Sequence, residues 1–271
     1  MSEFYKRTIT GTGIVSAIVF SVILGRYSFF ILCSAISLLG LFEFYRLFEI
    51  TKNAVRSAAG IALSASLLIT VFLLTLQYAD WKVLLLNLPL VSFVFVTVLF
   101  LKSDNAIVEV ACVLLGQVYI TLPLILLYCC AFALNKDEFC QNVILGYFFL
   151  LWANDTGAYV CGSVFGKRPL APIISPKKTW EGSAGGAFLA SVIVYINYYY
   201  FRDLSLVSWM VLGLTVILMG TTGDLVKSVM KRSRNVKDSG NILPGHGGIL
   251  DRFDSLIGSV PFVYIYLSFL D

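Results

Sequence analysis

The strongest constraint on this chain is a succession of apolar runs separated by short polar segments. A helix needs roughly 20 apolar residues to cross the hydrocarbon core of a membrane. Hydrophobic residues make up 58% of the 271 residues and charged residues 13%, too few charges to cover a soluble domain of this size. The composition excludes a disordered chain, a nucleic-acid-binding tail and an ordinary soluble enzyme. The runs are 9–24, 27–45, 57–76, 82–101, 106–134, 143–165, 183–201, 204–223 and 255–270.

These runs predict an all-α, polytopic integral membrane protein with about nine transmembrane helices, a cytosolic N-terminus and a polar cavity at the cytosolic face. The first run lacks a signal-peptide cleavage site, so we expect it to be a retained span. The run 106–134 allows one tilted span or two half-helices around Pro123. One span is favoured, because it puts 16 of the 20 Lys and Arg residues on the cytosolic side.

Polar residues concentrate in the second half of the chain. We therefore expect one membrane domain in two parts, a transmembrane scaffold at 1–142 and a catalytic region at 143–271 that carries two basic cytosolic loops.

The first polar cluster, 154–159, contains Asp155 inside an apolar run. An acid at mid-span costs about 2.5–3.5 kcal/mol on insertion scales, so it normally faces a cavity, a metal or a cationic partner. The alternative is a salt-bridged Asp near the end of a tilted helix.

The second cluster, 165–182, is a basic loop with Pro and Gly at its turns. Its charge fits either a ligand phosphate or anionic lipid at the membrane surface. Small residues at Gly182, Gly185 and Gly186 would let backbone approach a ligand or another helix closely. The candidate binding residues here are Lys167, Arg168, Ser175, Lys177 and Lys178.

The third cluster, 223–255, mixes carboxylates with cations around a turn in which glycines flank His246. If a helix continues through 224–232, Asp224, Ser228 and Lys231 share one face. Asp251 and Ser255 would form a similar i, i+4 pair at the start of the last span. The mixture suits a complex of a metal and a polyphosphate, because carboxylates hold Mg²⁺ while Lys and Arg neutralise phosphate. The alternative is a salt-bridged loop that clamps two helices.

At these residues the chain resembles a known family. The stretch Ser228-Val-Met-Lys-Arg, followed after four residues by Lys-Asp-Ser-Gly-Asn-Ile-Leu-Pro-Gly-His-Gly-Gly-Ile-Leu-Asp-Arg-Phe-Asp254, is similar to the signature of the CDP-diacylglycerol synthases, or phosphatidate cytidylyltransferases. The resemblance covers roughly 150–260 well. It implies the reaction of CTP with phosphatidate to give CDP-diacylglycerol and pyrophosphate, with Mg²⁺. It also implies a second, monovalent cation such as K⁺, and a homodimer among membrane lipids.

The resemblance extends to residue roles. Asp224 and Asp251 would be metal ligands, and Asp155 would line the cavity and hold the second cation or order water. The remaining catalytic candidates are Lys231, Arg232, Lys237 and His246, and the further substrate-binding candidates are Ser228, Gly247, Gly248 and Arg252.

Two other functions remain open from the sequence. A CTP-dependent lipid kinase, such as a polyprenol kinase, would use the same charges but transfer the γ-phosphate. A transporter of an anionic metabolite would normally place its site at the midplane between repeats, and this sequence has no repeat. We expect no nucleic-acid partner. The expected location is a bacterial inner membrane, with the active site facing the cytosol.

Overall fold

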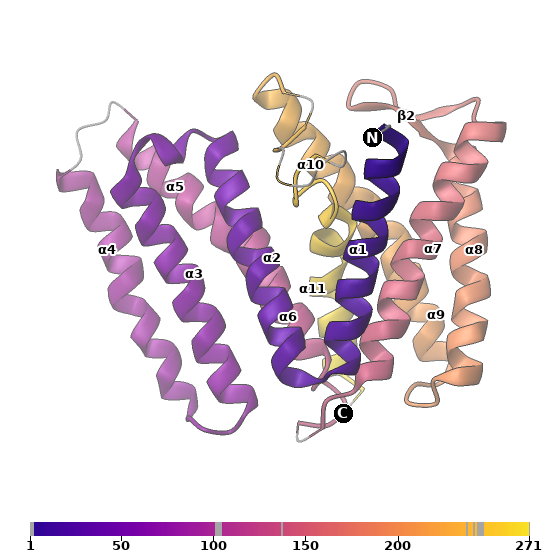
Figure 1. The fold of residues 1–271 in the computed structure, drawn as a ribbon, viewed down its shortest axis with the longest axis horizontal. Coiled ribbons are helices and arrows are strands. Elements are labelled where there is room, and N and C mark those ends of the chain that lie inside the picture. The colour runs from indigo at the N-terminus through magenta and orange to yellow at the C-terminus, as the bar shows by residue number, and fades with distance from the viewer. Residues whose placement is uncertain are drawn as a thin grey trace. The chain divides into compact units, whose positions relative to one another are not determined.

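Helices make up nearly all of the fold (Figure 1). The computed structural model describes residues 3–270 except 101–104, 137, 237, 241 and 243–246. The α-helices are α1 (Glu3–Ile23), α2 (Arg26–Leu47), α3 (Ala54–Thr75), α4 (Asn87–Phe100), α5 (Ala106–Gly116), α6 (Leu122–Cys130), α7 (Gln141–Phe165), α8 (Trp180–Tyr200), α9 (Leu206–Thr215), α10 (Thr221–Ser233) and α11 (Asp254–Ser268). Short helical turns are η1 (Ile50–Lys52), η2 (Trp81–Leu86), η3 (Gln117–Thr121) and η4 (Val216–Gly220).

The chain forms two compact units. The first consists of Met1–Cys129 and Lys237–Arg252, and the second of Cys130–Val236 and Phe253–Asp271. The first unit therefore combines α1 to α5 and most of α6 with a late segment of the chain, and the second contains α7 to α11. The functional division at residue 142, into scaffold and catalytic region, stays a prediction.

The apolar runs form membrane-compatible helices. Among the described residues, five helices are long and apolar enough to cross a membrane, and Thr8–Ile23 is a shorter apolar helix. The all-α, integral membrane character is thus confirmed, while the count of nine spans and their orientation stay predictions. The five helices are Arg26–Leu47, Ala54–Thr75, Trp81–Leu99, Ala106–Cys130 and Leu206–Ser233.

Two of these long helices contain a π-helical turn. The turn η3 joins α5 to α6, so the ambiguous run 106–134 forms one helix of 25 residues rather than two half-helices. Pro123 has no N–H to continue the helical hydrogen-bond ladder, and the ladder changes register in the turn just before it. The turn η4 joins α9 to α10 in the same way.

The only sheet in the described part of the chain is a small antiparallel hairpin, which the sequence did not predict. Strand β1 (Pro169–Ala171) pairs with β2 (Ser175–Thr179). The hairpin leads directly into α8, whose N-cap is Thr179, and the Thr179 hydroxyl accepts a hydrogen bond from the Gly182 N–H at 3.1 Å. The basic loop is therefore an ordered structure attached to a helix end.

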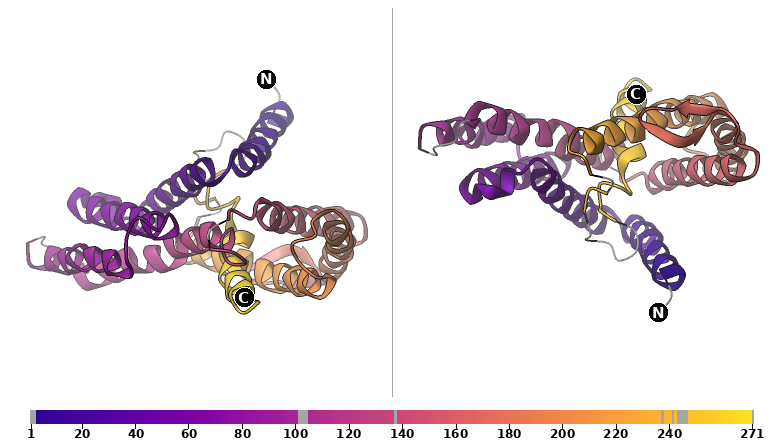
Figure 2. Two further views of the ribbon diagram at one scale, coloured as in Figure 1. Left: turned by 90° about the horizontal axis from the view of Figure 1, so that it is seen from below. Right: turned by 90° about the horizontal axis from the view of Figure 1, so that it is seen from above.

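Helices α7 and α8 run side by side in backbone contact (Figures 1 and 2). A Cβ added at Gly157 would lie 2.5 Å from the carbonyl oxygen of Gly185. A Cβ at Gly186 would lie 2.7 Å from the carbonyl oxygen of Asn154. Small residues in both helices thus allow the approach and hold the stretch around Asn154 and Asp155 in place.

The close approach of α7 to α8 predicts the effect of one methyl group. Gly157→Ala should destabilise the protein by about 1–3 kcal/mol, because the new Cβ meets backbone that has no rotamer to change. Gly13→Ala is the control, since nothing lies within 4 Å of a Cβ there. Thermal unfolding of both variants in detergent checks the difference, and equal melting temperatures would contradict this packing.

Candidate functional site

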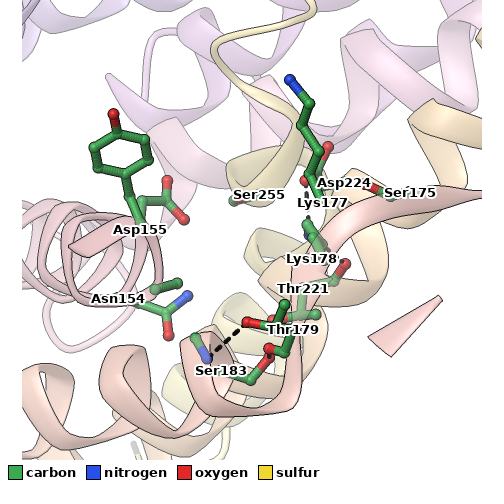
Figure 3. A pocket seen from close by; sticks show the side chains of 13 residues that line it. Asn154, Asp155, Ser175, Lys177, Lys178, Thr179, Ser183, Thr221, Asp224 and Ser255 are labelled. Atoms are coloured by element: carbon green, nitrogen blue, oxygen red, sulfur yellow. Dashed lines mark hydrogen bonds and ion pairs between the residues drawn. The ribbon is translucent and has the colours of Figure 1, made fainter. Parts of the chain in front are cut away.

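The second unit contains a polar cavity of about 330 Å³. In Figure 3, Asn154 and Asp155 of α7 lie on one side of it, and Lys177, Lys178 and Thr179 of β2 lie on the other. Helices α8, α10 and α11 complete the wall. The lining residues are Asn154, Asp155, Ala158, Tyr159, Ser175, Lys177, Lys178, Thr179, Gly182, Ser183, Thr221, Asp224 and Ser255.

Beside the cavity, four charges of alternating sign join three segments of the chain. Lys178 Nζ lies 2.6 Å from an Asp224 carboxylate oxygen, and Lys227 Nζ lies 3.5 Å from the other. Lys227 also donates a hydrogen bond to Asp254. We call this set, Lys178–Asp224–Lys227–Asp254, the charge chain. It connects the hairpin to α10 and α11.

The charge chain is more deeply buried at one end than at the other. The side chains of Lys227 and Asp254 are 9% and 11% exposed, whereas those of Lys178 and Asp224 are 27% and 26% exposed. Separating a buried ion pair leaves a buried charge without a partner, which is strongly destabilising. The buried end of the charge chain therefore keeps α10 against α11, and the more exposed end remains accessible from the cavity.

The cavity wall carries acidic and basic side chains. Asp155 and Asp224 contribute carboxylates, and Ser255 contributes a hydroxyl group to the same lining. Carboxylate and hydroxyl oxygens are the donors that Mg²⁺ prefers, so these residues fit such an ion chemically. Lys177 and Lys178 on the facing strand suit phosphate oxygens.

The base of the hairpin is attached to α8 by an acid. The Glu181 carboxylate accepts backbone N–H groups from Lys167 and Arg168, both at 3.1 Å. These donors hold the pKa of Glu181 below its usual value. Lys167 and Arg168 are exposed and lie outside the cavity lining, so their backbone orders the hairpin while their side chains face solvent.

The segment around Asp251 lies in the first unit, where its carboxylate organises a turn. One oxygen of Asp251 accepts the Ser239 N–H at 3.0 Å, the Ser239 hydroxyl at 2.9 Å and the Gly248 N–H at 3.2 Å. Gly247 has a φ of 83°, which favours glycine. The expected helical pair of Asp251 with Ser255 is wrong, because α11 begins only at Asp254 and Asp251 belongs to the turn before it.

The other predicted residues are distributed over the two units. Helix α10 covers 224–232, as expected, and Ser228, Lys231 and Arg232 lie on it beyond Asp224, outside the cavity lining. Arg252 is exposed in the first unit. Lys237 and His246 lie outside the described residues. The structure thus brings together Asp155, Ser175, Lys177, Lys178 and Asp224 in one cavity, and Gly247, Gly248 and Asp251 in one turn.

Sequence reasoning missed several residues of the site. Lys227 and Asp254 were noted only as part of the charge pattern, although the i, i+3 spacing of Asp224 and Lys227 was a signal for their pairing. Thr221 and Ser183 gave no signal, because single hydroxyl residues in apolar helices are common. They reach the cavity only because α8 and α10 both form part of its wall.

Comparison with known proteins identifies the family. A family model described as "Cytidylyltransferase family" matches residues 5–270, so this chain belongs to that family of nucleotidyltransferases. It is 36% identical to the phosphatidate cytidylyltransferase of Bacillus subtilis, over 99% of each chain. It is also 34% identical to the enzyme of that name from Staphylococcus haemolyticus, over 95% of this chain and 97% of the relative. The resemblance seen in the sequence is confirmed.

The charge chain predicts a non-additive effect on stability. Lys227→Met leaves Asp254 buried without its cation and should lower the free energy of unfolding by about 3–5 kcal/mol. The double variant Lys227→Met/Asp254→Asn removes both charges and should recover part of the loss. Chemical unfolding in detergent measures the coupling. Strictly additive losses would show that the pair does not anchor α10 to α11.

The attachment of Glu181 predicts a change in protease sensitivity. Glu181→Ala should speed tryptic cleavage after Lys167 and Lys177, because the hairpin base loses both backbone bonds. The control is Glu138→Gln, an exposed acid elsewhere in the second unit. Since the folded pKa is lowered, the protection should persist at pH 5 and disappear only as the pH falls through that lowered value. Identical cleavage rates would contradict the role.

Proposed function

We propose that this chain is a phosphatidate cytidylyltransferase, which converts CTP and phosphatidate to CDP-diacylglycerol and pyrophosphate in phospholipid biosynthesis. The observation that carries the proposal is a cavity with carboxylates on one side and lysines on the other, in a member of the cytidylyltransferase family. The full-length similarity to relatives named for this activity supports it.

The reaction requires one bond to form and one to break. A phosphate oxygen of phosphatidate attacks the α-phosphorus of CTP, and the bond from that phosphorus to the bridging oxygen of the β-phosphate breaks. Pyrophosphate leaves with the electron pair. Phosphatidate is already anionic at neutral pH, so the chain need not supply a strong general base. Catalysis then consists mainly of positioning and of charge neutralisation.

The carboxylates are assigned to cation binding. Asp224, Asp251 and Asp155 would hold Mg²⁺ and a second, monovalent cation such as K⁺. Bound Mg²⁺ supplies neutralisation of phosphate charge. Lys178 and Lys227 keep the Asp224 carboxylate ionised and oriented toward the cavity before any substrate enters.

The cations are assigned to the two substrates together. Lys177 and Lys178 line the cavity and face the triphosphate or the lipid phosphate. Ser175 adds a hydroxyl group to the same cavity, and Ser228 on α10 is a further candidate for substrate binding. His246, Gly247 and Gly248 would shape a phosphate loop. Further positive charge at the membrane surface comes from Lys167, Arg168, Lys231, Arg232, Lys237 and Arg252.

The setting in the membrane completes the proposal. We infer nine spans, a cytosolic N-terminus and a cavity open to the cytosol, since CTP is water-soluble and the Lys and Arg residues favour that side. The bacterial relatives support a location in a bacterial membrane, which we propose is the inner (cell) membrane. We also propose a homodimer, which crosslinking in native membranes would test.

Labelled nucleotide distinguishes this activity from its alternatives. Purified protein in detergent is incubated with phosphatidate, Mg²⁺ and CTP labelled at either the α- or the γ-phosphate. We expect the α-label in lipid, the γ-label in pyrophosphate, and no transfer with EDTA. The γ-label in lipid would instead indicate a lipid kinase. No transfer of either label would overturn the enzymatic proposal and leave binding or transport to be tested.

The assignment of Asp224 as a metal ligand predicts how turnover changes when one of its carboxylate oxygens is replaced by an amide nitrogen. Asp224→Asn should lower turnover on the order of 100-fold or more, because a carboxamide binds a cation far more weakly than a carboxylate. Membrane insertion and detergent behaviour should be unchanged. Asp80→Asn, an exposed acid of the first unit, serves as the control and should retain normal turnover. Substantial activity of Asp224→Asn would remove Asp224 from the metal site.

A further inference from the structure

An acid in the first unit has no role in the reaction proposed above. Glu43 lies in the last turns of α2, and only 2% of its surface is exposed. Burying a carboxylate is costly unless hydrogen-bond donors surround it. The residues that contact Glu43 therefore indicate why this helix contains an acid.

Those contacts come from the described residues of 238–252, a part of the signature stretch. The Leu250 N–H donates to Glu43 Oε2 at 3.0 Å. A Cβ at Gly240 would lie 2.6 Å from Glu43 Oε1, and a Cβ at Gly248 would lie 2.5 Å from Oε2. Gly240 and Gly248 thus lie close to the two carboxylate oxygens, and the absence of side chains there leaves room for Glu43.

Asp251 holds the same segment from within. It follows Leu250 directly, and its own carboxylate accepts bonds from Ser239 and Gly248. Glu43 accepts the backbone N–H of Leu250, while Asp251 accepts the N–H and hydroxyl of Ser239 and the N–H of Gly248. Two carboxylates, one from α2 and one from Asp251 itself, therefore restrain the backbone on the N-terminal side of Asp251.

Apolar contacts with α2 also hold Ile249 and Leu250 in place. A Cβ at Gly40, one helical turn before Glu43, would lie 3.4 Å from Leu250 and 3.8 Å from Ile249. The side chains of both residues are buried, at 3% and 6% exposure. Helix α2 therefore holds residues 249 and 250 by their side chains through Gly40 and by their backbone through Glu43.

We propose that Glu43 is a positioning residue, which orients the Asp251 carboxylate for cation binding by holding the backbone that precedes it. This inference rests on the proposed role of Asp251 as a metal ligand. It assigns to the N-terminal half of the chain a part in cation binding.

Three variants separate positioning from simple stability. Glu43→Met keeps the size of the side chain but removes the acceptor, whereas Glu43→Gln retains an acceptor oxygen and tests rescue. Gln117→Met is the matched control. Gln117 is a buried polar residue of the same unit, and its side chain forms hydrogen bonds with Tyr45, Gly60 and Thr121 rather than with the described residues of 238–252.

Two measurements on the purified full chain are needed, Mn²⁺ affinity by electron paramagnetic resonance and hydrogen exchange of 247–252. Glu43→Met should weaken Mn²⁺ binding by about tenfold or more and speed exchange in this segment. Glu43→Gln should lie nearer the wild type in both. Gln117→Met should lower the melting temperature and leave both measurements unchanged.

Each other result decides against the proposal or against its premise. Normal Mn²⁺ affinity and exchange in Glu43→Met, or equal losses in Gln117→Met, would overturn the role of Glu43. Normal Mn²⁺ affinity in Asp251→Asn would instead overturn the assignment of Asp251 as a ligand. If Glu43→Met fails to insert, Gly240→Ala displaces the same carboxylate from the opposite side and should give the same two changes.

Discussion

A charge taken out of water must meet an opposite charge, and this constraint organises the second unit. Lys227 and Asp254 are nearly enclosed and pair with each other, so neither charge is buried alone. Their pairing brings α11 against α10, and Lys227 then reaches back to Asp224. Lys178 approaches the same carboxylate from the hairpin. Ion pairing therefore brings together the charged side chains of this cavity wall. Apolar contacts between helices alone would not favour this arrangement of lysines and aspartates.

The opposite wall depends on close backbone packing. Because Gly157, Gly185 and Gly186 carry no side chains, α7 and α8 approach until backbone atoms touch. Asn154 is buried at this contact, and the next residue, Asp155, faces the cavity. From the sequence, Gly185 and Gly186 could allow close approach of either a ligand or a neighbouring helix. In the structure they allow α8 to pack closely against α7. Packing on one side and ion pairing on the other thus produce one polar cavity.

Much of this architecture could be predicted from sequence, because hydropathy and the cost of burying charge act locally. The helical membrane fold, the family, and the concentration of polar chemistry at Asp155, Lys178 and Asp224 were all predicted. The hairpin was missed, because a five-residue strand rich in Lys and Pro has little strand propensity of its own. Glu43 was also missed. It lies some 200 residues before Leu250, its partner, and an isolated acid near a helix end looks like any interfacial residue.

The π turn η4 has a consequence for how such chains tolerate insertion and deletion. A π turn accommodates one more residue than the α-helix around it, and one residue corresponds to about 100° of helix rotation. Deleting one residue from the α-helical part would turn every side chain beyond it by that angle. Deleting one residue from 216–220 would instead close the wide turn to an ordinary α turn, so the side chains of α10, Asp224 and Lys227 among them, would keep their direction. This apolar turn is therefore a place where the helix can lose a residue while the charged face of α10 stays aligned with its partners.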